Sequence, residues 1–243
     1  MKKITLITGA GRGIGKQIAI KFAEENHVLI LLVHKTKQKR ELTKILKDKK
    51  SQFSILVGDL KSHKFIKSLD KNIKKIDNLI NNAASANTKF FTDVTIKDLD
   101  GVIDVNLKST FKLSQIFAKK MIKNKIKGNI INISSQLGHI GAYNRTASCM
   151  TKFGIEGLTK SMALDLSKYG IRVNTVAPTK TIVNKDEIIK TKKRLNIIKK
   201  KIPLGKFSTV EEIAGITYFL TTETAGSITG TCIISDGGWT SGK

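Results

Sequence analysis

The segment Thr8 to Gly15, TGAGRGIG, joins a short aliphatic run to an amphipathic one and decides how the chain is interpreted. The run KITLIT at 3–8 has strand character, and a helical pattern opens at Ile14. Glycines in such a turn let the backbone bend tightly and approach an anion, which the positive end of the helix dipole attracts. A strand, a glycine-rich turn and a helix in this order predict a site for the pyrophosphate of a dinucleotide.

Further aliphatic runs follow the first one, and amphipathic stretches of about 10–20 residues, a length typical of helices, separate them. The expected strands are 28–33, 53–57, 78–83, 129–134, 171–177 and 231–235. This alternation indicates βαβ units, and near-continuous apolar strands indicate a sheet covered on both faces. We therefore predict a single α/β domain over 1–243, with a doubly wound parallel sheet of seven strands and helices on both faces, the Rossmann fold.

The composition predicts a soluble protein with a large core, because 40% of the residues are hydrophobic and 26% are charged. The longest purely aliphatic run is Val28 to Val33. It is far shorter than the roughly 20 apolar residues that span a bilayer. The start MKKITLITGA also lacks the apolar region of a signal peptide. We expect a cytoplasmic protein without a membrane partner.

The formal charge of +25 raises the question of a nucleic-acid partner. Groove-reading proteins favour arginine for its planar, bidentate fork, yet only five of the 44 basic residues are arginine. The excess is lysine spread along helix faces. We therefore expect non-specific attraction to polyanions but no specific nucleic-acid partner.

The cysteines and histidines show no ligand spacing. Cys149 and Cys232 stand far apart, without a CxxC motif. The four histidines form neither an HxxxH nor an HExxH pattern. The sequence therefore predicts neither a disulfide nor a metal site.

The end of the second predicted strand bears on the choice of nucleotide. An acidic residue there would bind the adenosine ribose hydroxyls and repel a 2′-phosphate. The chain instead continues from Val33 into His34 and Lys35, with no acid before Glu41, and Arg12 adds a cation from the glycine-rich turn. This pattern favours NADP(H) over NAD(H), although Lys35 also begins a solvated basic run.

With these motifs in order, the chain resembles the classical short-chain dehydrogenase/reductases. The resemblance extends from TGAGRGIG to the terminal ITGTCIISDGG, nearly the whole length. It implies an NAD(P)-dependent oxidoreductase that acts on a small alcohol or carbonyl substrate. It also implies a homo-oligomer, a tetramer or a dimer, with helices at about 99–124 and 149–168 as the expected interface.

The resemblance and the glycine-rich turn together indicate the nucleotide-binding residues. Asp59 and Leu60 match the pair that holds the adenine ring, and Asn82 and Ala83 belong to a motif that follows the fourth strand. Thr179 stands where the family usually has a glycine after proline. The full expected set is Gly9, Gly11, Arg12, Gly13, Ile14, Gly15, His34, Lys35, Asp59, Leu60, Asn82, Ala83, Lys152, Pro178 and Thr179.

The resemblance also assigns catalytic positions. Asn106 matches an asparagine of the proton relay, Ser135 the serine that orients the substrate oxygen, and Lys152 the lysine beside the nicotinamide ribose. The family's catalytic tyrosine should lie four residues before Lys152 and thirteen after Ser135, and both counts reach Ser148. An alkyl hydroxyl is a much weaker acid than a phenol, and its oxygen lies closer to the backbone. Tyr143 precedes the predicted helix and has no evident route into the site.

Two functions follow from this substitution. The chain is either an oxidoreductase that interconverts a secondary alcohol and a ketone, impaired or modified by Ser148, or a non-catalytic nucleotide-binding homologue that acts as a structural or regulatory partner. Its substrate pocket is expected along 84–95, 136–143 and 180–201. The last segment, polar and lysine-dense, follows the sixth predicted strand and is either a substrate lid or an inert surface helix.

Overall fold

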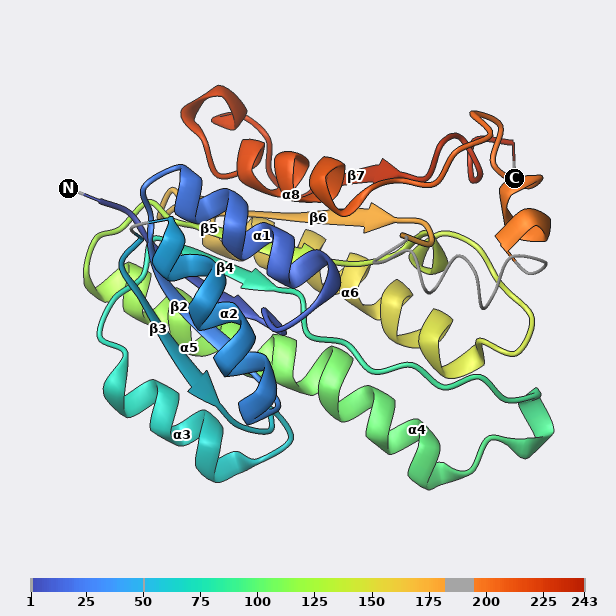
Figure 1. Ribbon diagram of the computed structural model, residues 1–243, viewed down its shortest axis with the longest axis horizontal. Helices are drawn as coiled ribbons and strands as arrows, with labels where there is room; N and C mark the ends of the chain where they lie inside the picture. Colours follow the sequence, from blue (N-terminus) through green and yellow to red (C-terminus); the bar gives the residue numbers. More distant parts are fainter. Residues whose placement is uncertain (1, 50, 182–194, 243) are drawn as a thin grey trace.

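The computed structural model describes residues 2–49, 51–181 and 195–242 (Figure 1). Seven parallel strands form one sheet in the order β3-β2-β1-β4-β5-β6-β7. The strands are β1 (Ile4–Thr8), β2 (Val28–Val33), β3 (Phe53–Val57), β4 (Asn78–Asn81), β5 (Asn129–Ile133), β6 (Arg172–Pro178) and β7 (Cys232–Ser235). The predicted single α/β domain with a doubly wound sheet is confirmed.

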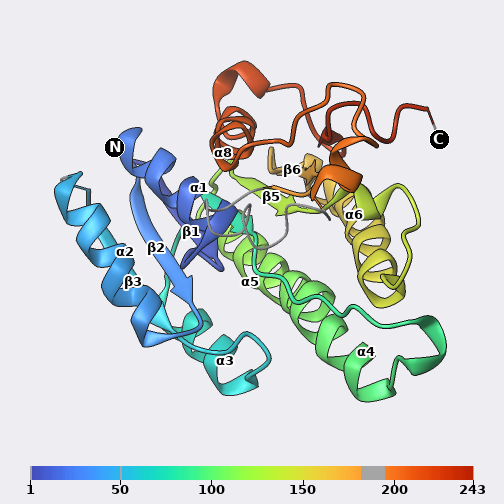
Figure 2. The same cartoon turned by 45° about the vertical axis from the view of Figure 1, so that its right-hand side comes forward.

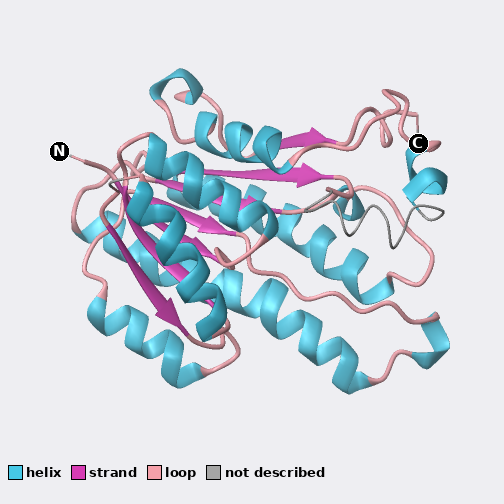
Figure 3. Ribbon diagram, in the orientation of Figure 1, coloured by secondary structure: helices cyan, strands magenta, loops and turns pink. Residues whose placement is uncertain are grey.

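Helices cover both faces of the sheet (Figure 3). One face carries α1 (Gly13–Glu24), α2 (Thr36–Asp48) and α8 (Val210–Phe219). The other carries α3 (His63–Asn72), α5 (Ser109–Lys123) and α6 (Thr146–Ser167). Neighbouring side chains of β1 enter opposite cores, since Ile7 belongs to the first and Leu6 to the second. The strands read as continuous apolar runs because both of their faces are buried.

The predicted helix at 99–124 has internal structure. It consists of the end of α4 (Ile96–Ile103), a π-helical turn at Asp104–Lys108, and α5. Such π-bulges widen a helix locally and are frequent at functional sites. α4, the π-helical turn and α5 run end to end, and α6 lies beside α4 and the π-helical turn (Figures 1 and 2).

Several boundaries differ slightly from the sequence-based predictions. The strand predicted at 78–83 ends at Asn81, because the next residue turns back to contact the loop after β1. The helix expected near Ser148 begins at Thr146. Residues 182–194 of the predicted lid lie outside the described residues, while residues 195–199 are helical and Leu195 is buried. Within the described part of the chain, no helix is long and apolar enough to cross a membrane.

Candidate active site

The predicted site residues gather at the carboxyl ends of the strands. In the sheet, β1 has β2 as its neighbour on one side and β4 on the other, so the chain runs outward from β1 in one direction through β3 and in the opposite direction from β4. Strand order reverses at this point, and ligands of doubly wound sheets bind in the crevice that such a reversal opens.

The glycine-rich loop has a backbone that favours glycine at several positions. Gly9 and Gly13 have φ angles of +64° and +54°. A Cβ atom on Gly15 would lie 2.3 Å from the carbonyl oxygen of Gly9. Arg12 precedes α1 without a side-chain cap, and the first turn contains no acid. The loop therefore leaves the helix N-terminus open to an anion, which fits a bound pyrophosphate.

The loop after β4 is held directly against this turn. The side-chain nitrogen of Asn82 donates to the carbonyl oxygen of Thr8 at 3.0 Å, and the backbone nitrogens of Asn82 and Ala83 both donate to Thr8 Oγ1 at 2.9 Å. Asn81 instead points into the core, where its side chain donates to Asn132. Hydrogen bonds thus fix the start of the loop after β4 against the end of β1, where the glycine-rich loop begins.

The turn after β2 is ordered by a residue that sequence reasoning missed. The side-chain oxygen of Gln38 accepts hydrogen bonds from the backbone nitrogens of His34 and Lys35, at 3.2 and 3.0 Å. Its side chain also lies over Gly11, where an added Cβ would come within 2.6 Å of it. Gln38 is the third residue of α2, a position from which a glutamine side chain commonly caps the helix N-terminus. A glutamine at this place in the sequence was the signal that could have predicted its role. The side chains of His34, Lys35 and Arg12 are exposed.

The expected adenine-binding pair lies at the end of β3. Asp59 is half-buried, and its carboxylate accepts a hydrogen bond from the backbone nitrogen of Lys61 at 2.9 Å. Leu60 packs partly buried against the core. The aspartate therefore stabilises its own turn and keeps its remaining oxygen available.

Asn106 joins three elements. Its side-chain oxygen accepts from the backbone nitrogen of Ser85 at 2.8 Å, and its side-chain nitrogen donates to Ser85 O and Thr151 Oγ1, both at 3.0 Å. Thr151 in turn donates to the carbonyl oxygen of Ser148 at 3.0 Å. The π-helical turn, the loop after β4 and α6 are therefore clamped together through Asn106. No spacing in the sequence identified Ser85 or Thr151.

Lys152 is buried, and its Nζ donates to the carbonyl oxygen of Ile133 at 2.7 Å. Loss of hydration lowers the pKa of Lys152 to about 8, against a smaller opposing effect of the Glu156 charge. Ser135 caps the 3-10 helix Gln136–Gly138, and its Oγ accepts a hydrogen bond from the backbone nitrogen of Leu137 at 3.2 Å. A lysine with a lowered pKa and a hydroxyl thus lie at the end of β5.

Ser148 lies in the first turns of α6 and is only 5% exposed. Its Oγ has no hydrogen-bond partner among the described residues, and the same is true of the buried Oγ of Thr179. Tyr143 does not fill the space, because its side chain is 95% exposed. Two buried hydroxyl groups therefore remain available to a bound molecule.

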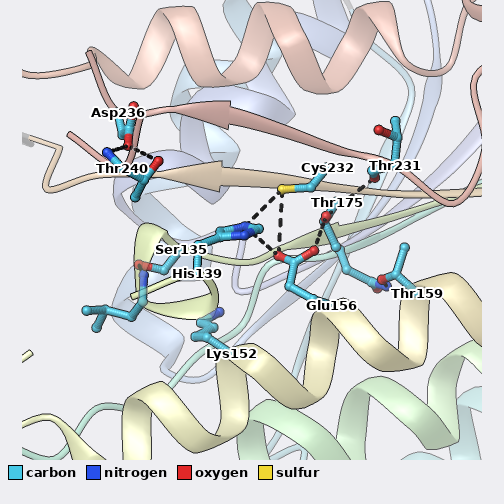
Figure 4. Close-up of polar contacts among 12 residues, drawn as sticks. Ser135, His139, Lys152, Glu156, Thr159, Thr175, Thr231, Cys232, Asp236 and Thr240 are labelled. Atoms are coloured by element: carbon cyan, nitrogen blue, oxygen red, sulfur yellow. Dashed lines mark hydrogen bonds and ion pairs between the residues drawn. The ribbon is translucent and has the colours of Figure 1, made fainter. Parts of the chain in front are cut away.

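Two residues from the predicted substrate-pocket segments differ in their surroundings. Asn87 has a buried side-chain oxygen without a hydrogen-bond partner in the described structure. His139, in contrast, turns toward Glu156 and Cys232 (Figure 4). That cluster of side chains is the main feature the sequence analysis did not find.

A glycine-rich turn at the switch point of a parallel sheet, with a buried lysine and a serine beyond it, defines the class of dinucleotide-binding oxidoreductases. The chain belongs to the short-chain dehydrogenase/reductase family. Residues 9–240 match the family model described as enoyl-(acyl carrier protein) reductase.

Relatives with different substrates resemble the chain over nearly their whole length. The 3-oxoacyl-(acyl-carrier-protein) reductase FabG of Buchnera aphidicola subsp. Baizongia pistaciae is 36% identical, covering 98% of this chain and 97% of its own. The L-xylulose reductase of Mus musculus is 34% identical, covering 96% and 95%. A crystal structure of a putative NAD(P) dependent gluconate 5-dehydrogenase from Beutenbergia cavernae with bound NADP superposes with a TM-score of 0.91, at 27% identity and 98% and 97% coverage.

Proposed function

We propose that the chain is an NADP(H)-dependent oxidoreductase that interconverts a secondary alcohol and a ketone, with slow turnover because Ser148 stands at the tyrosine position. The proposal rests on the position of Lys152. Its buried ammonium donates a hydrogen bond to the carbonyl oxygen of Ile133, at the strand ends where the substrate would meet the cofactor. When bound, the cofactor supplies the hydride equivalent. The remaining tasks, binding, orientation and proton supply, belong to the protein.

The loop residues support nucleotide binding. The open N-terminus of α1 suits the pyrophosphate, while Asp59, Leu60 and Asn82 would line the path of the adenosine half along the strand ends. Lys152, Pro178 and Thr179 would hold the nicotinamide end, where the buried Thr179 hydroxyl is available.

The preference for NADP(H) rests on charge. Arg12, His34 and Lys35 are exposed at the turn that would receive the adenosine ribose, and no acid follows before Glu41. The two cations Arg12 and Lys35 in this place favour a 2′-phosphate over a free hydroxyl, and the His34 ring can donate a further hydrogen bond. The Beutenbergia cavernae structure holds NADP at low occupancy, which supports this proposal.

The substrate oxygen needs an orienting donor and a proton. Ser135 would donate a hydrogen bond to it, and Asn106 would hold α6 in register with the loop after β4. Ser148 cannot match a phenol as an acid, so water beside its unpartnered Oγ would relay the proton from Lys152. Loss of general acid help typically costs 10²–10⁴-fold in rate, about 3–5 kcal/mol.

The second candidate is a non-catalytic nucleotide-binding homologue that acts as a structural or regulatory partner. The buried and unpartnered Ser148 Oγ favours it, together with the outward position of Tyr143. This candidate requires tight binding of the nucleotide and no turnover.

The deciding experiment measures NADPH consumption over a panel of ketones, aldehydes, ketoses and 3-oxoacyl thioesters. The unaltered chain and its Ser148→Tyr variant are assayed side by side. Turnover by both supports an enzyme that works through Ser148 or water. Turnover by the tyrosine variant alone supports the non-catalytic homologue, and NADPH binding without turnover by either would contradict the oxidoreductase function.

We also propose that the chain forms a homo-oligomer through α5 and α6. Apolar side chains stay exposed on these helices: Phe111 is 49%, Phe153 50% and Leu164 78% exposed. Phe153 and Leu164 are eleven residues apart and so share one helix face, on which Gly157 leaves room for a close neighbour. Exposed apolar faces of this kind mark interfaces between subunits.

A further inference from the structure

Three potential ligands converge at the β7 side of the sheet, away from the switch point. His139 Nε2 lies 3.3 Å from Cys232 Sγ and 3.4 Å from Glu156 Oε1, and Cys232 Sγ lies 3.7 Å from the same carboxylate oxygen. The ligand atoms of the three residues all lie within 4.8 Å of one another. Figure 4 shows the three side chains pointing toward a common centre. One imidazole, one carboxylate and one thiol form a donor set suited to zinc and similar cations.

The spacing of these atoms matches the edges of a metal tetrahedron. Zinc takes sulfur at about 2.3 Å and nitrogen or oxygen at about 2.0–2.2 Å. Tetrahedral angles then place sulfur and nitrogen about 3.5 Å apart, nitrogen and oxygen about 3.4 Å apart, and sulfur and oxygen about 3.6 Å apart. The three observed distances of 3.3, 3.4 and 3.7 Å reproduce this triangle closely. A cation could therefore enter with little movement of the side chains.

Neighbouring residues also fix the orientation of the ligand side chains. Thr175 Oγ1 in β6 donates to the second oxygen of Glu156 at 2.7 Å, which orients the carboxylate. Gly138 seats the 3-10 helix directly on α6, because an added Cβ would lie 3.0 Å from the carbonyl oxygen of Lys152 and 3.2 Å from Glu156 Cγ. The side chains of His139 and Glu156 are 25% and 12% exposed. The site is therefore built by four elements and remains open to water on one side.

We propose that His139, Glu156 and Cys232 bind a divalent transition-metal ion such as Zn²⁺, with water in the fourth position. Binding breaks the S–H bond of Cys232, forms the metal–sulfur bond and releases the proton to solvent. The sequence-based expectation of no metal site came from residue spacing alone, and these ligands are 17 and 76 residues apart. The bound ion would join the 3-10 helix after Ser135 to α6 and β7.

A thiol nucleophile is the other chemistry that these groups suggest. It requires the sulfur to face a substrate, whereas both His139 and Glu156 occupy the neighbourhood of Cys232 Sγ. The three distances fit the edges of a zinc tetrahedron, and for that reason we favour metal binding over a nucleophilic thiol.

The test titrates the chelator-treated full chain with Zn²⁺ in competition with a chromogenic chelator, and with Co²⁺ followed by absorbance. We expect about one equivalent to bind, a thiolate charge-transfer band with Co²⁺, and a higher melting temperature with Zn²⁺. His139→Gln and Cys232→Ser should abolish the cobalt band. Thr175→Val should weaken zinc binding by roughly 10–100-fold, the usual effect of removing an outer-shell partner.

The matched controls are Cys149→Ser and His63→Gln, because Cys149 contacts Ile140 and His63 is exposed on α3. Both should bind Zn²⁺ like the unaltered chain, and circular dichroism checks that every variant is folded. Absence of the cobalt thiolate band in the unaltered chain would overturn the proposal. So would unchanged zinc affinity in folded Cys232→Ser or His139→Gln. These measurements involve no turnover and stand apart from the proposed oxidoreductase function.

Discussion

The Lys152 ammonium and the Ile133 carbonyl oxygen are joined by a 2.7 Å hydrogen bond at the buried end of β5. Burial of this charge lowers the pKa of Lys152 from 10.5 to about 8. A lysine whose pKa is lowered by folding destabilises the folded state at any pH at which both the folded and the unfolded chain carry its proton. The burial that prepares Lys152 for proton transfer therefore costs folding free energy, and the hydrogen bond to Ile133 offsets part of that cost.

Replacing Lys152 should reveal this cost through its pH dependence. Near pH 7 we expect Lys152→Met to be more stable than the unaltered chain, by at most about 3 kcal/mol less the lost hydrogen bond, because burial lowers the pKa of Lys152 to about 8. Between pH 8 and 10.5 the unfolded chain holds the proton and the folded chain does not, so the unaltered chain gains stability as pH rises. Urea unfolding at several pH values measures the difference. A gap that stays constant from pH 7 to 10 would argue against the buried charge.

Restoring a phenol should restore the proton donor. We expect Ser148→Tyr to raise kcat/KM for ketone reduction by roughly 10²–10⁴-fold, the usual worth of general acid catalysis. Ser148→Phe is the matched control, because it introduces the ring without the hydroxyl and should stay slow. Steady-state NADPH oxidation gives both values. Equal rates for the phenylalanine and tyrosine variants would show that packing, and not proton donation, had been repaired.

The choice of nucleotide should depend on Lys35. Lys35→Asp should weaken NADPH binding by about tenfold or more while leaving NADH binding unchanged or improved, since one charge-assisted contact is worth about 1.5–3 kcal/mol. Lys37→Asp makes the same change in charge two residues farther on and should have little effect. Nicotinamide fluorescence titrations measure both dissociation constants. Similar losses in the two variants would assign the effect to general charge.

The close approach of Gly15 to Gly9 should make the loop intolerant of a side chain. We expect Gly15→Ala to weaken nucleotide binding and to destabilise the fold by roughly 1–3 kcal/mol, because its Cβ would lie 2.3 Å from a carbonyl oxygen. Gly215 in α8 has open space around it, and Gly215→Ala should stabilise the helix by about 0.5–1 kcal/mol. Thermal unfolding and NADPH titration compare the two. Equal tolerance of both alanines would contradict the loop geometry.

The proposed interface should be sensitive to charge on α6. Leu164→Lys should lower the molecular mass measured by light scattering to that of a smaller assembly, because a buried lysine across a subunit contact is costly. Val57→Lys, on the edge strand β3, offers the matched control with a partly exposed apolar residue. An unchanged mass for Leu164→Lys would place the interface elsewhere.

Much of the fold was predictable because its signals are local. Aliphatic runs identified each strand to within two residues, since a strand buried on both faces needs apolar side chains throughout. Thr8 to Gly15 identified the nucleotide loop, because positive φ angles favour glycine and the close contact between Gly15 and Gly9 leaves no room for a Cβ atom. Counting along the chain also placed Ser148 one helical turn before Lys152, and α6 keeps that register.

Tertiary structure alone decided which distant side chains meet. The sequence offered no sign that Asn106 would bridge Ser85 and Thr151, since each contact depends on how the π-helical turn packs against α6. The cluster of His139, Glu156 and Cys232 likewise joins a 3-10 helix, an α-helix and an edge strand. Periodicity and spacing describe one element at a time, whereas a site of this kind exists only where separate elements are packed within a few ångströms of one another.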